Sequence, residues 1–148
     1  MVTLISRWTI RIGITDDERK SLISNLRALA KTVEAAEPQT LSYRVHTAAA
    51  DPRKQNASGE SATPTTSATP TTSATPTTED QRYVTFYEIY ECDRSFQIHL
   101  DGKPFNDFVR DNLQYFEENP DRAGYPLTKT TFLHKESGFF RSQADHAL

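Results

Sequence analysis

Cysteine, glycine and long apolar stretches are scarce in this chain of 148 residues. A single cysteine, Cys92, excludes an intramolecular disulfide framework and a cysteine-cluster zinc site. The five glycines form no glycine-rich phosphate loop, which argues against a nicotinamide or flavin fold. No apolar run reaches transmembrane length. The net charge of −3 indicates no basic surface for nucleic acid or an anionic membrane.

Targeting signals and metal ligands are also missing from the sequence. The apolar run at Met1–Trp8 is too short for a secretory signal, and Arg7 interrupts it, so we expect a soluble, cytoplasmic protein. The histidines show no ligand spacing, and we expect neither a metal nor a cofactor. They are His46, His99, His134 and His146.

Residues 48–81 contain no Val, Ile, Leu, Phe, Tyr, Trp, Met or Cys and include three tandem copies of Ser-Ala-Thr-Pro-Thr-Thr. Such a segment cannot form a core, and we predict a disordered loop with polyproline II character. It could be a tether or a modification site, although slippage of a short DNA repeat within a surface loop is the favoured explanation. Because closure entropy grows slowly with loop length, the insertion predicts a hairpin loop inside one domain of residues 1–136. Residues 137–148 are expected to form a loose tail.

The remaining chain alternates between strand and helix patterns. Residues 2–12 have a period of two, which predicts a half-buried strand with Ser6, Trp8 and Ile12 on one face. Thr15 and Glu18 form a capping box that begins a helix. Its apolar stripe consists of Leu22, Leu26, Leu29 and Val33, and the helix is expected to stop before Pro38.

Three further strands and a split helix complete the predicted pattern. The strands are expected at 40–47, with Leu41, Tyr43 and Val45 on one side, at 82–91 and at 127–135. A short helix at 94–101, capped by Asp93, precedes a longer helix from about 104 to 118. The order β-α-β-β-α-β predicts a ferredoxin-like α+β sandwich with helices on one sheet face. A second copy could cover the other face, which predicts a homodimer.

Several segments carry a resemblance to a known family. They are Ile5-Ser-Arg-Trp-Thr-Ile10, Leu41-Ser-Tyr-Arg44, Tyr87-Glu-Ile-Tyr90 and Ser95-Phe-Gln-Ile-His-Leu100 with Phe105. The chain resembles the antibiotic biosynthesis monooxygenase domain family of dimeric α/β barrels. That resemblance implies cofactor-free oxygenation, in which the anion of a phenol, hydroquinone or anthrone reduces O₂ directly. The family's haem-degrading branch uses Asn, Trp and His where this chain has Ser6, His99 and Val109, which argues against haem degradation.

His99 is the candidate catalytic residue. It lies one helical turn after Phe96, on the apolar side of its predicted helix, and it aligns with a histidine common in the family. Imidazole can take and return a phenolic proton because its pKa lies near working pH. The alternative is a core histidine bonded to a backbone carbonyl, and the sequence leaves both open.

The candidate substrate-binding residues are mainly aromatic. Ser6 could bond a substrate oxygen, and Trp8 could stack on a planar ring, although a core tryptophan is the more ordinary interpretation. The other candidates are Tyr43, Phe96, Phe105 and Phe108, of which Phe105 and Phe108 are also expected in the core.

Two acidic neighbourhoods lead to separate predictions. Glu88, at a place where the family commonly has Glu, is interpreted as a structural partner for an arginine such as Arg7 or Arg44 inside the dimer.

Cys92 lies between Glu91 and Asp93, whose charges would raise the pKa of its thiol and oppose a nucleophilic role.

The resemblance therefore implies a homodimeric, cofactor-independent monooxygenase of secondary metabolism that acts with O₂ on an aromatic phenol, quinol or anthrone. Two alternatives stay open. One is oxygenation or isomerisation of a non-aromatic, oxylipin-like molecule, and the other is a non-catalytic ligand-binding or dimerisation module.

Overall fold

A four-stranded antiparallel sheet and three α-helices form two layers in the described part of the chain, residues 1–48 and 79–134 of a computed structural model. The elements are β1 (Val2–Thr9), α1 (Asp16–Ala36), β2 (Thr40–Thr47), β3 (Tyr83–Tyr90), α3 (Asp93–Asp101), α4 (Lys103–Asn112) and β4 (Thr128–Phe132). Short 3₁₀ turns, η2 (Glu79–Arg82) and η3 (Leu113–Tyr115), precede β3 and follow α4. The predicted ferredoxin-like α+β class is confirmed.

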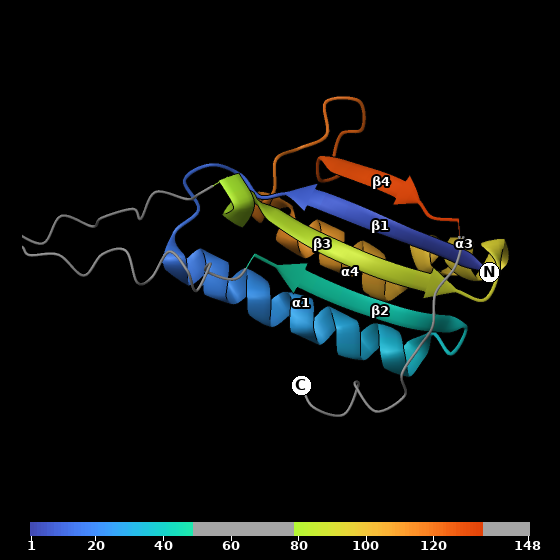
Figure 1. The fold of residues 1–148 in the computed structure, drawn as a ribbon. Coiled ribbons are helices and arrows are strands. Elements are labelled where there is room, and N and C mark those ends of the chain that lie inside the picture. The colour runs from blue at the N-terminus through green and yellow to red at the C-terminus, as the bar shows by residue number, and fades with distance from the viewer. Residues whose placement is uncertain (49–78, 135–148) are drawn as a thin grey trace, which may run out of the picture.

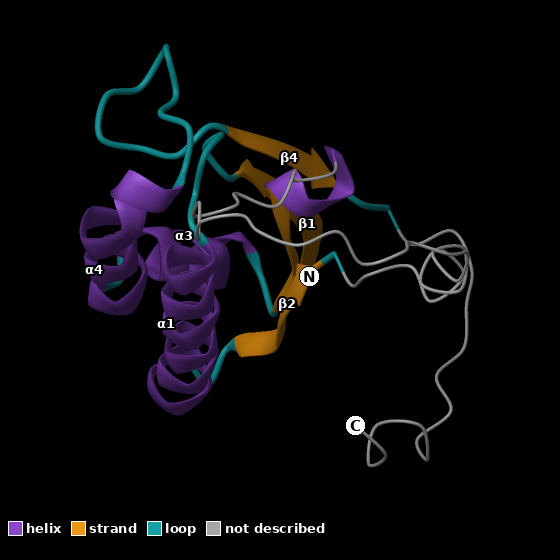
Figure 2. Cartoon of the chain, turned by 90° about the vertical axis from the view of Figure 1, so that its left-hand side faces the viewer, coloured by secondary structure: helices purple, strands orange, loops and turns teal. Residues whose placement is uncertain are grey.

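The sheet has the strand order β2-β3-β1-β4, with every neighbouring pair antiparallel (Figure 1). The three α-helices lie on one side of the sheet, as the view turned by 90° shows (Figure 2). Because β2 and β3 pair along their lengths, the predicted insertion does join two neighbouring strands of a hairpin. Most of that segment, and the predicted tail at 137–148, lie outside the described residues.

Strand alternation determines which side chains meet the helices. Leu4, Ser6 and Trp8 of β1 are buried, and each pairs in register with a buried residue of β3. Those partners are Glu88, Phe86 and Val84. Because paired residues of neighbouring strands project to the same face, this register builds one continuous surface beneath the helices.

The capping box begins α1 as predicted. The Glu18 amide donates to the Thr15 hydroxyl at 3.2 Å, and the Thr15 amide donates to the Glu18 carboxylate at 2.8 Å. The predicted apolar stripe of Leu22, Leu26, Leu29 and Val33 is buried. Apolar residues spaced three or four positions apart therefore hold the helix against the sheet.

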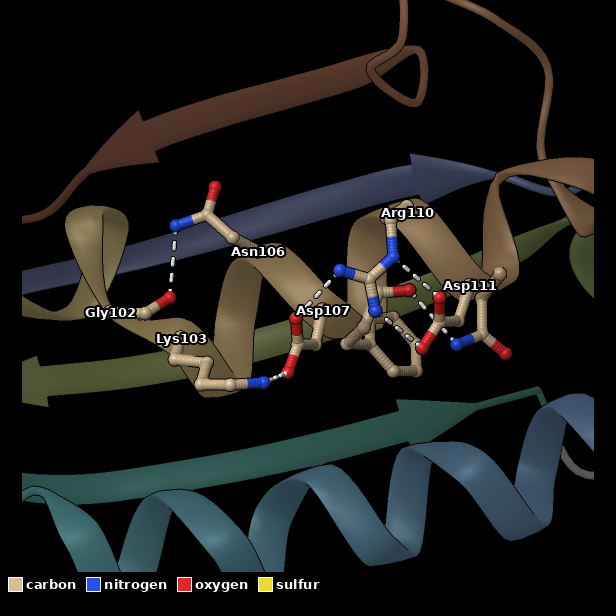
Figure 3. A network of polar contacts seen from close by, with 8 residues as sticks. Gly102, Lys103, Asn106, Asp107, Arg110 and Asp111 are labelled. Atoms are coloured by element: carbon tan, nitrogen blue, oxygen red, sulfur yellow. Dashed lines mark hydrogen bonds and ion pairs between the residues drawn. The ribbon is translucent and has the colours of Figure 1, made fainter.

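Gly102 separates α3 from α4 at a crowded position. A Cβ there would lie 3.0 Å from the Ile98 carbonyl oxygen and 3.1 Å from the His99 carbonyl oxygen. The Asn106 amide donates to the Gly102 carbonyl at 2.9 Å and so fastens the start of α4. Figure 3 shows this bond and the charged side chains of Lys103, Asp107, Arg110 and Asp111, whose ion pairs run along the outside of α4. The opposite side of α4 buries Phe105, Phe108 and Val109.

Five local predictions were wrong. β1 ends at Thr9 rather than at residue 12, and Ile12 is 76% exposed after the chain turns away. Leu41 is 58% exposed because the register shifts between Thr40 and Ser42. The last helix stops at Asn112 and β4 covers only Thr128–Phe132. Asp93 is the first residue of α3, since Cys92 takes the N-cap position.

Replacement of Thr15 by alanine should lower the free energy of unfolding by about 1 kcal/mol, because the amides at the start of α1 lose their side-chain acceptor. Urea denaturation followed by circular dichroism measures this difference. Thr32→Ala, which removes an exposed hydroxyl from the same helix, is the matched control and should be nearly neutral. Equal midpoints for the two variants would contradict the capping role.

Candidate functional site

A cavity of about 610 Å³ lies between the sheet and the layer formed by α3 and α4. Ligand pockets commonly have volumes of about 300–1,000 Å³, so this space can hold a small organic molecule. Its wall combines aromatic, aliphatic and polar side chains from β1, β3, β4, both helices and the segment before β4. The central wall residues are Leu4, Ser6, Trp8, Glu88, Phe96, His99, Phe105 and Thr130.

His99 is fully buried, with 1% of its surface exposed, and its ring is held by Glu37. The distance from His99 Nδ1 to Glu37 Oε2 is 2.8 Å, and the Thr40 hydroxyl donates to the same oxygen at 2.9 Å. An ionised carboxylate can only accept, which places a proton on Nδ1. His99 Nε2 is buried and has no hydrogen-bond partner in residues 1–48 and 79–134. In the neutral ring this second nitrogen carries the lone pair.

Burial lowers the pKa of His99, and the nearby Glu37 carboxylate opposes that effect without cancelling it. A buried cation is costly because it loses its hydration, so the neutral form is favoured. A neutral imidazole with an oriented Nδ1–H and a free Nε2 is chemically a base. The sequence left open a core histidine bonded to a backbone carbonyl. The structure differs from that alternative, because the partner of Nδ1 is a carboxylate.

Glu37 is the residue that the sequence analysis missed. It is 6% exposed and follows Val33 by four positions, so it continues the apolar stripe of α1 beyond the last helical residue. A carboxylate on such a stripe was the available signal, because an acid at a core position needs a partner. Because Glu37 precedes Pro38, the sequence pattern at this position indicated only the end of the helix.

A second acidic group, Glu88, also lines the cavity. The Tyr90 hydroxyl donates to Glu88 Oε2 at 2.6 Å. Burial is the largest cause that raises the pKa of Glu88 to about 7, and the Tyr90 hydrogen bond partly opposes it. Burial likewise raises the pKa of Tyr90, so its phenol keeps the proton that it donates.

The predicted pairing of Glu88 with an arginine is wrong for this chain. Arg7 and Arg44 pair in register with Thr85 and Tyr87, which project from the opposite face of the sheet. Arg7 instead lies over the Tyr83 ring, 5.2 Å from its centroid. The period of two, applied to β3, places Glu88 on the cavity side together with Phe86 and Tyr90.

Trp8 and Ser6 form a hydrogen-bonded pair in the cavity wall. The Trp8 indole donates to the Ser6 hydroxyl at 3.0 Å, and that hydroxyl lies 3.2 Å from the Thr130 hydroxyl. Trp8 also packs edge-on against Phe105 and Phe116, with centroid distances of 6.0 and 5.3 Å. It therefore belongs to both the core and the cavity wall.

The structure brings most of the predicted site residues together. Those that line the cavity are Ser6, Trp8, Phe96, His99 and Phe105. Tyr43 and Phe108 are not among the lining residues. Tyr43 packs behind the imidazole at 5.2 Å between ring centroids, and Phe108 packs behind Trp8 at 6.1 Å. Their predicted contact with substrate would therefore be indirect.

The segment between η3 and β4 supplies cavity residues that had no sequence signal. The Glu117 amide donates to the Thr9 carbonyl at 2.9 Å and anchors this segment to the end of β1. Beyond that anchor, Arg122 and Tyr125 line the cavity, with the guanidinium carbon 3.3 Å from the tyrosine ring centroid. Loop residues carry no periodicity, so only the folded chain places them at the site.

The prediction for Cys92 was wrong in direction. Its thiol lies 3.3 Å from the Ser95 hydroxyl at the start of α3. This hydrogen bond is the largest of the effects that lower the thiol pKa, and the charge of Glu91 only partly opposes them. Helix geometry therefore outweighs the local acidic sequence.

Within residues 1–48 and 79–134, no group of three or more His, Cys, Asp or Glu side chains is arranged to hold a metal ion. Within the same ranges, each helix is too short or too polar to span a bilayer.

Comparison with known proteins gave results for structure only. No protein-family model matches the chain, and no curated protein does. A solved antibiotic biosynthesis monooxygenase superposes with a TM-score of 0.51 at 13% identity, over 91% of this chain and 98% of that one. The fold is that of the antibiotic biosynthesis monooxygenases.

Two further structures with this fold extend the comparison. A candidate antibiotic biosynthesis monooxygenase from Nitrosomonas europaea has a TM-score of 0.54 and 12% identity, covering 93% of this chain and 100% of its own. A dimeric protein of unknown function from Bacteroides fragilis, described as ferredoxin-like, has a TM-score of 0.56 and 9% identity, covering 90% and 95%. At these identities the likeness is one of fold and carries no activity to this chain.

Replacement of Glu37 by glutamine should lower the pKa of His99 further, because the carboxylate charge that favours imidazolium is removed. The pH dependence of the histidine ring signals in NMR spectra measures this shift. Glu34→Gln, an exposed carboxylate on the same helix, should leave the His99 titration unchanged. An unchanged or raised His99 pKa in Glu37→Gln would show that the two side chains do not interact in solution.

Proposed function

We propose that this protein is a cofactor-independent monooxygenase that oxidises an aromatic phenol, quinol or anthrone with O₂. The observation that carries the proposal is the buried His99 at the cavity, with Nδ1 bonded to Glu37 and Nε2 left without a partner among the described residues. The monooxygenase fold supports the same reaction class. The aromatic wall favours a flat, apolar substrate.

The reaction begins with a proton transfer to the imidazole. His99 Nε2 takes an acidic proton from the substrate, and the resulting anion delocalises its charge over the aromatic rings. Addition of O₂ at carbon and return of the proton form a hydroperoxide. Cleavage of its O–O bond with loss of the remaining hydrogen on that carbon converts CH₂ to C=O and releases water, so one oxygen atom enters the product and the other leaves in water.

The aromatic side chains around His99 would hold the ring of the substrate. Trp8, Phe96 and Phe105 present apolar surfaces around His99, and the His99 and Phe105 rings lie 5.0 Å apart. An anion in such surroundings is favoured only when its charge is spread over a large π system. This requirement selects phenols and anthrones over aliphatic alcohols.

Replacement of His99 by alanine should reduce kcat/KM for oxidation of 1,8-dihydroxyanthrone by about 100-fold or more, because the base is lost. Oxygen uptake in a closed electrode cell, corrected for autoxidation in buffer, measures the rate. His46→Ala removes an exposed histidine of β2 and serves as the matched control. Equal rates for His99→Ala and the wild type would remove His99 from the mechanism.

We also propose that the protein is a homodimer that covers the open face of the sheet. Ile5, Tyr87 and Ile89 lie on that face and are only partly buried within one chain. Paired apolar side chains left open to water favour association with a matching surface. The dimeric ferredoxin-like structure from Bacteroides fragilis supports this arrangement.

Ile5→Lys should convert the dimer to a monomer, because the added charge would be buried between two sheets beside Arg7. Sedimentation velocity at micromolar concentration measures the mass. Ile98→Lys changes an exposed apolar residue of α3 on the helical layer and should leave the dimer intact. A wild-type protein that sediments as a monomer would rule out this interface.

A further inference from the structure

Glu88 is a cavity group that the proposed proton transfer does not use. It lies on the cavity face of β3, and its register partner on β1 is Leu4. Tyr90, which holds Glu88, also contacts the catalytic imidazole, with ring centroids 5.4 Å apart. Glu88 and His99 therefore both line the cavity and have Tyr90 as a common neighbour.

The hydrogen bond from Tyr90 determines which oxygen of Glu88 can act. Because the tyrosine hydroxyl donates to Oε2 at 2.6 Å, a proton on the carboxyl group belongs on Oε1. Among the described residues, the side chain of Glu88 takes part in one hydrogen bond, which Tyr90 donates. Oε1 is consequently the oxygen that can donate to a molecule in the cavity.

Several titratable groups surround Glu88. They are Tyr43 opposite it on β2, Tyr90 on its own strand, Glu37 at the end of α1 and His99 on α3. Burial and the charge of Glu37 raise the pKa of Glu88 to about 7, while the bond from Tyr90 lowers it. A substantial fraction of the carboxyl group is therefore protonated near neutral pH.

We propose that Glu88 donates a hydrogen bond to a carbonyl oxygen of the substrate. The inference rests on the proposed function, since it adds a residue to that same site. An anthrone offers one removable proton to His99 and one acceptor oxygen to Glu88, so it is a suitable probe for this bond.

The same bond would act during the reaction. When His99 takes a proton from the ring carbon opposite the carbonyl, the negative charge of the anion concentrates on the carbonyl oxygen. A positioned donor at that oxygen stabilises the developing charge more than the neutral ketone. Glu88 would then be a catalytic residue, and Tyr90 would position it.

Binding without oxygen tests the proposal. The probes are anthrone and 9,10-dihydroanthracene, which has the same ring skeleton without the carbonyl. Quenching of Trp8 fluorescence reports binding directly, because Trp8 lines the cavity and is the one tryptophan of the sequence. Anthrone affinity of the wild type should fall about tenfold from about pH 6 to about pH 8 as Glu88 loses its proton. Affinity for 9,10-dihydroanthracene should not change.

Substitutions of Glu88 separate its role as a hydrogen-bond donor from its packing in the cavity. Glu88→Gln keeps a donor of similar size and should bind anthrone without pH dependence over this range. Glu88→Met lacks a donor and should bind anthrone about tenfold more weakly than wild type at about pH 6. Glu91→Gln, at an exposed carboxylate just beyond β3, should behave as wild type. Retained pH dependence in Glu88→Gln would overturn the proposal.

The wild-type profile alone is also decisive if a variant fails to fold. A flat anthrone affinity across the range, or the same decline for 9,10-dihydroanthracene, would refute hydrogen bonding by Glu88. Anaerobic binding is independent of oxygen chemistry. Anthrone that binds with the expected pH dependence but gives no oxygen uptake would therefore refute the proposed function while supporting the role of Glu88.

Discussion

The buried pair of Glu37 and His99 is the interaction on which the site depends. It joins the end of α1 to the last turn of α3 across 62 positions of sequence, at 2.8 Å. Either group alone would be a costly buried polar side chain, and the bond between His99 Nδ1 and Glu37 Oε2 lowers that cost and fixes the imidazole orientation. The orientation of the ring is thus a consequence of how α1 ends, whereas its neutral form is a consequence of burial.

The same sheet face serves two purposes along its length. Val84 and Phe86 belong to the apolar core with Trp8, whereas Glu88 and Tyr90 continue β3 as a polar pair at the cavity. Strand alternation places all of them on one face, so the change from core to site needs no change in backbone structure. The rigid core supports the polar end, where precise orientation matters.

Much of the fold could be predicted because its signals are local. The capping box, the stripe of α1 and the break at Gly102 each act within a few residues. Predictions failed where a neighbouring element decided the result. The bulge that exposes Leu41 arises from pairing with β3, and the thiol of Cys92 responds to the first turn of α3 rather than to adjacent acids.

The candidate site also combines features that local sequence patterns predict with features that depend on contacts between distant segments. The amino-acid pattern by itself determined the two-layer class, the inward face of β1 and the presence of His99 on the apolar side of a helix, since periodicity follows from backbone geometry. Only the tertiary structure decided that Glu37 meets His99, that Tyr90 orients Glu88 and that Arg122 reaches the cavity. Contacts between distant segments depend on packing in three dimensions, and a single sequence carries no period that encodes them.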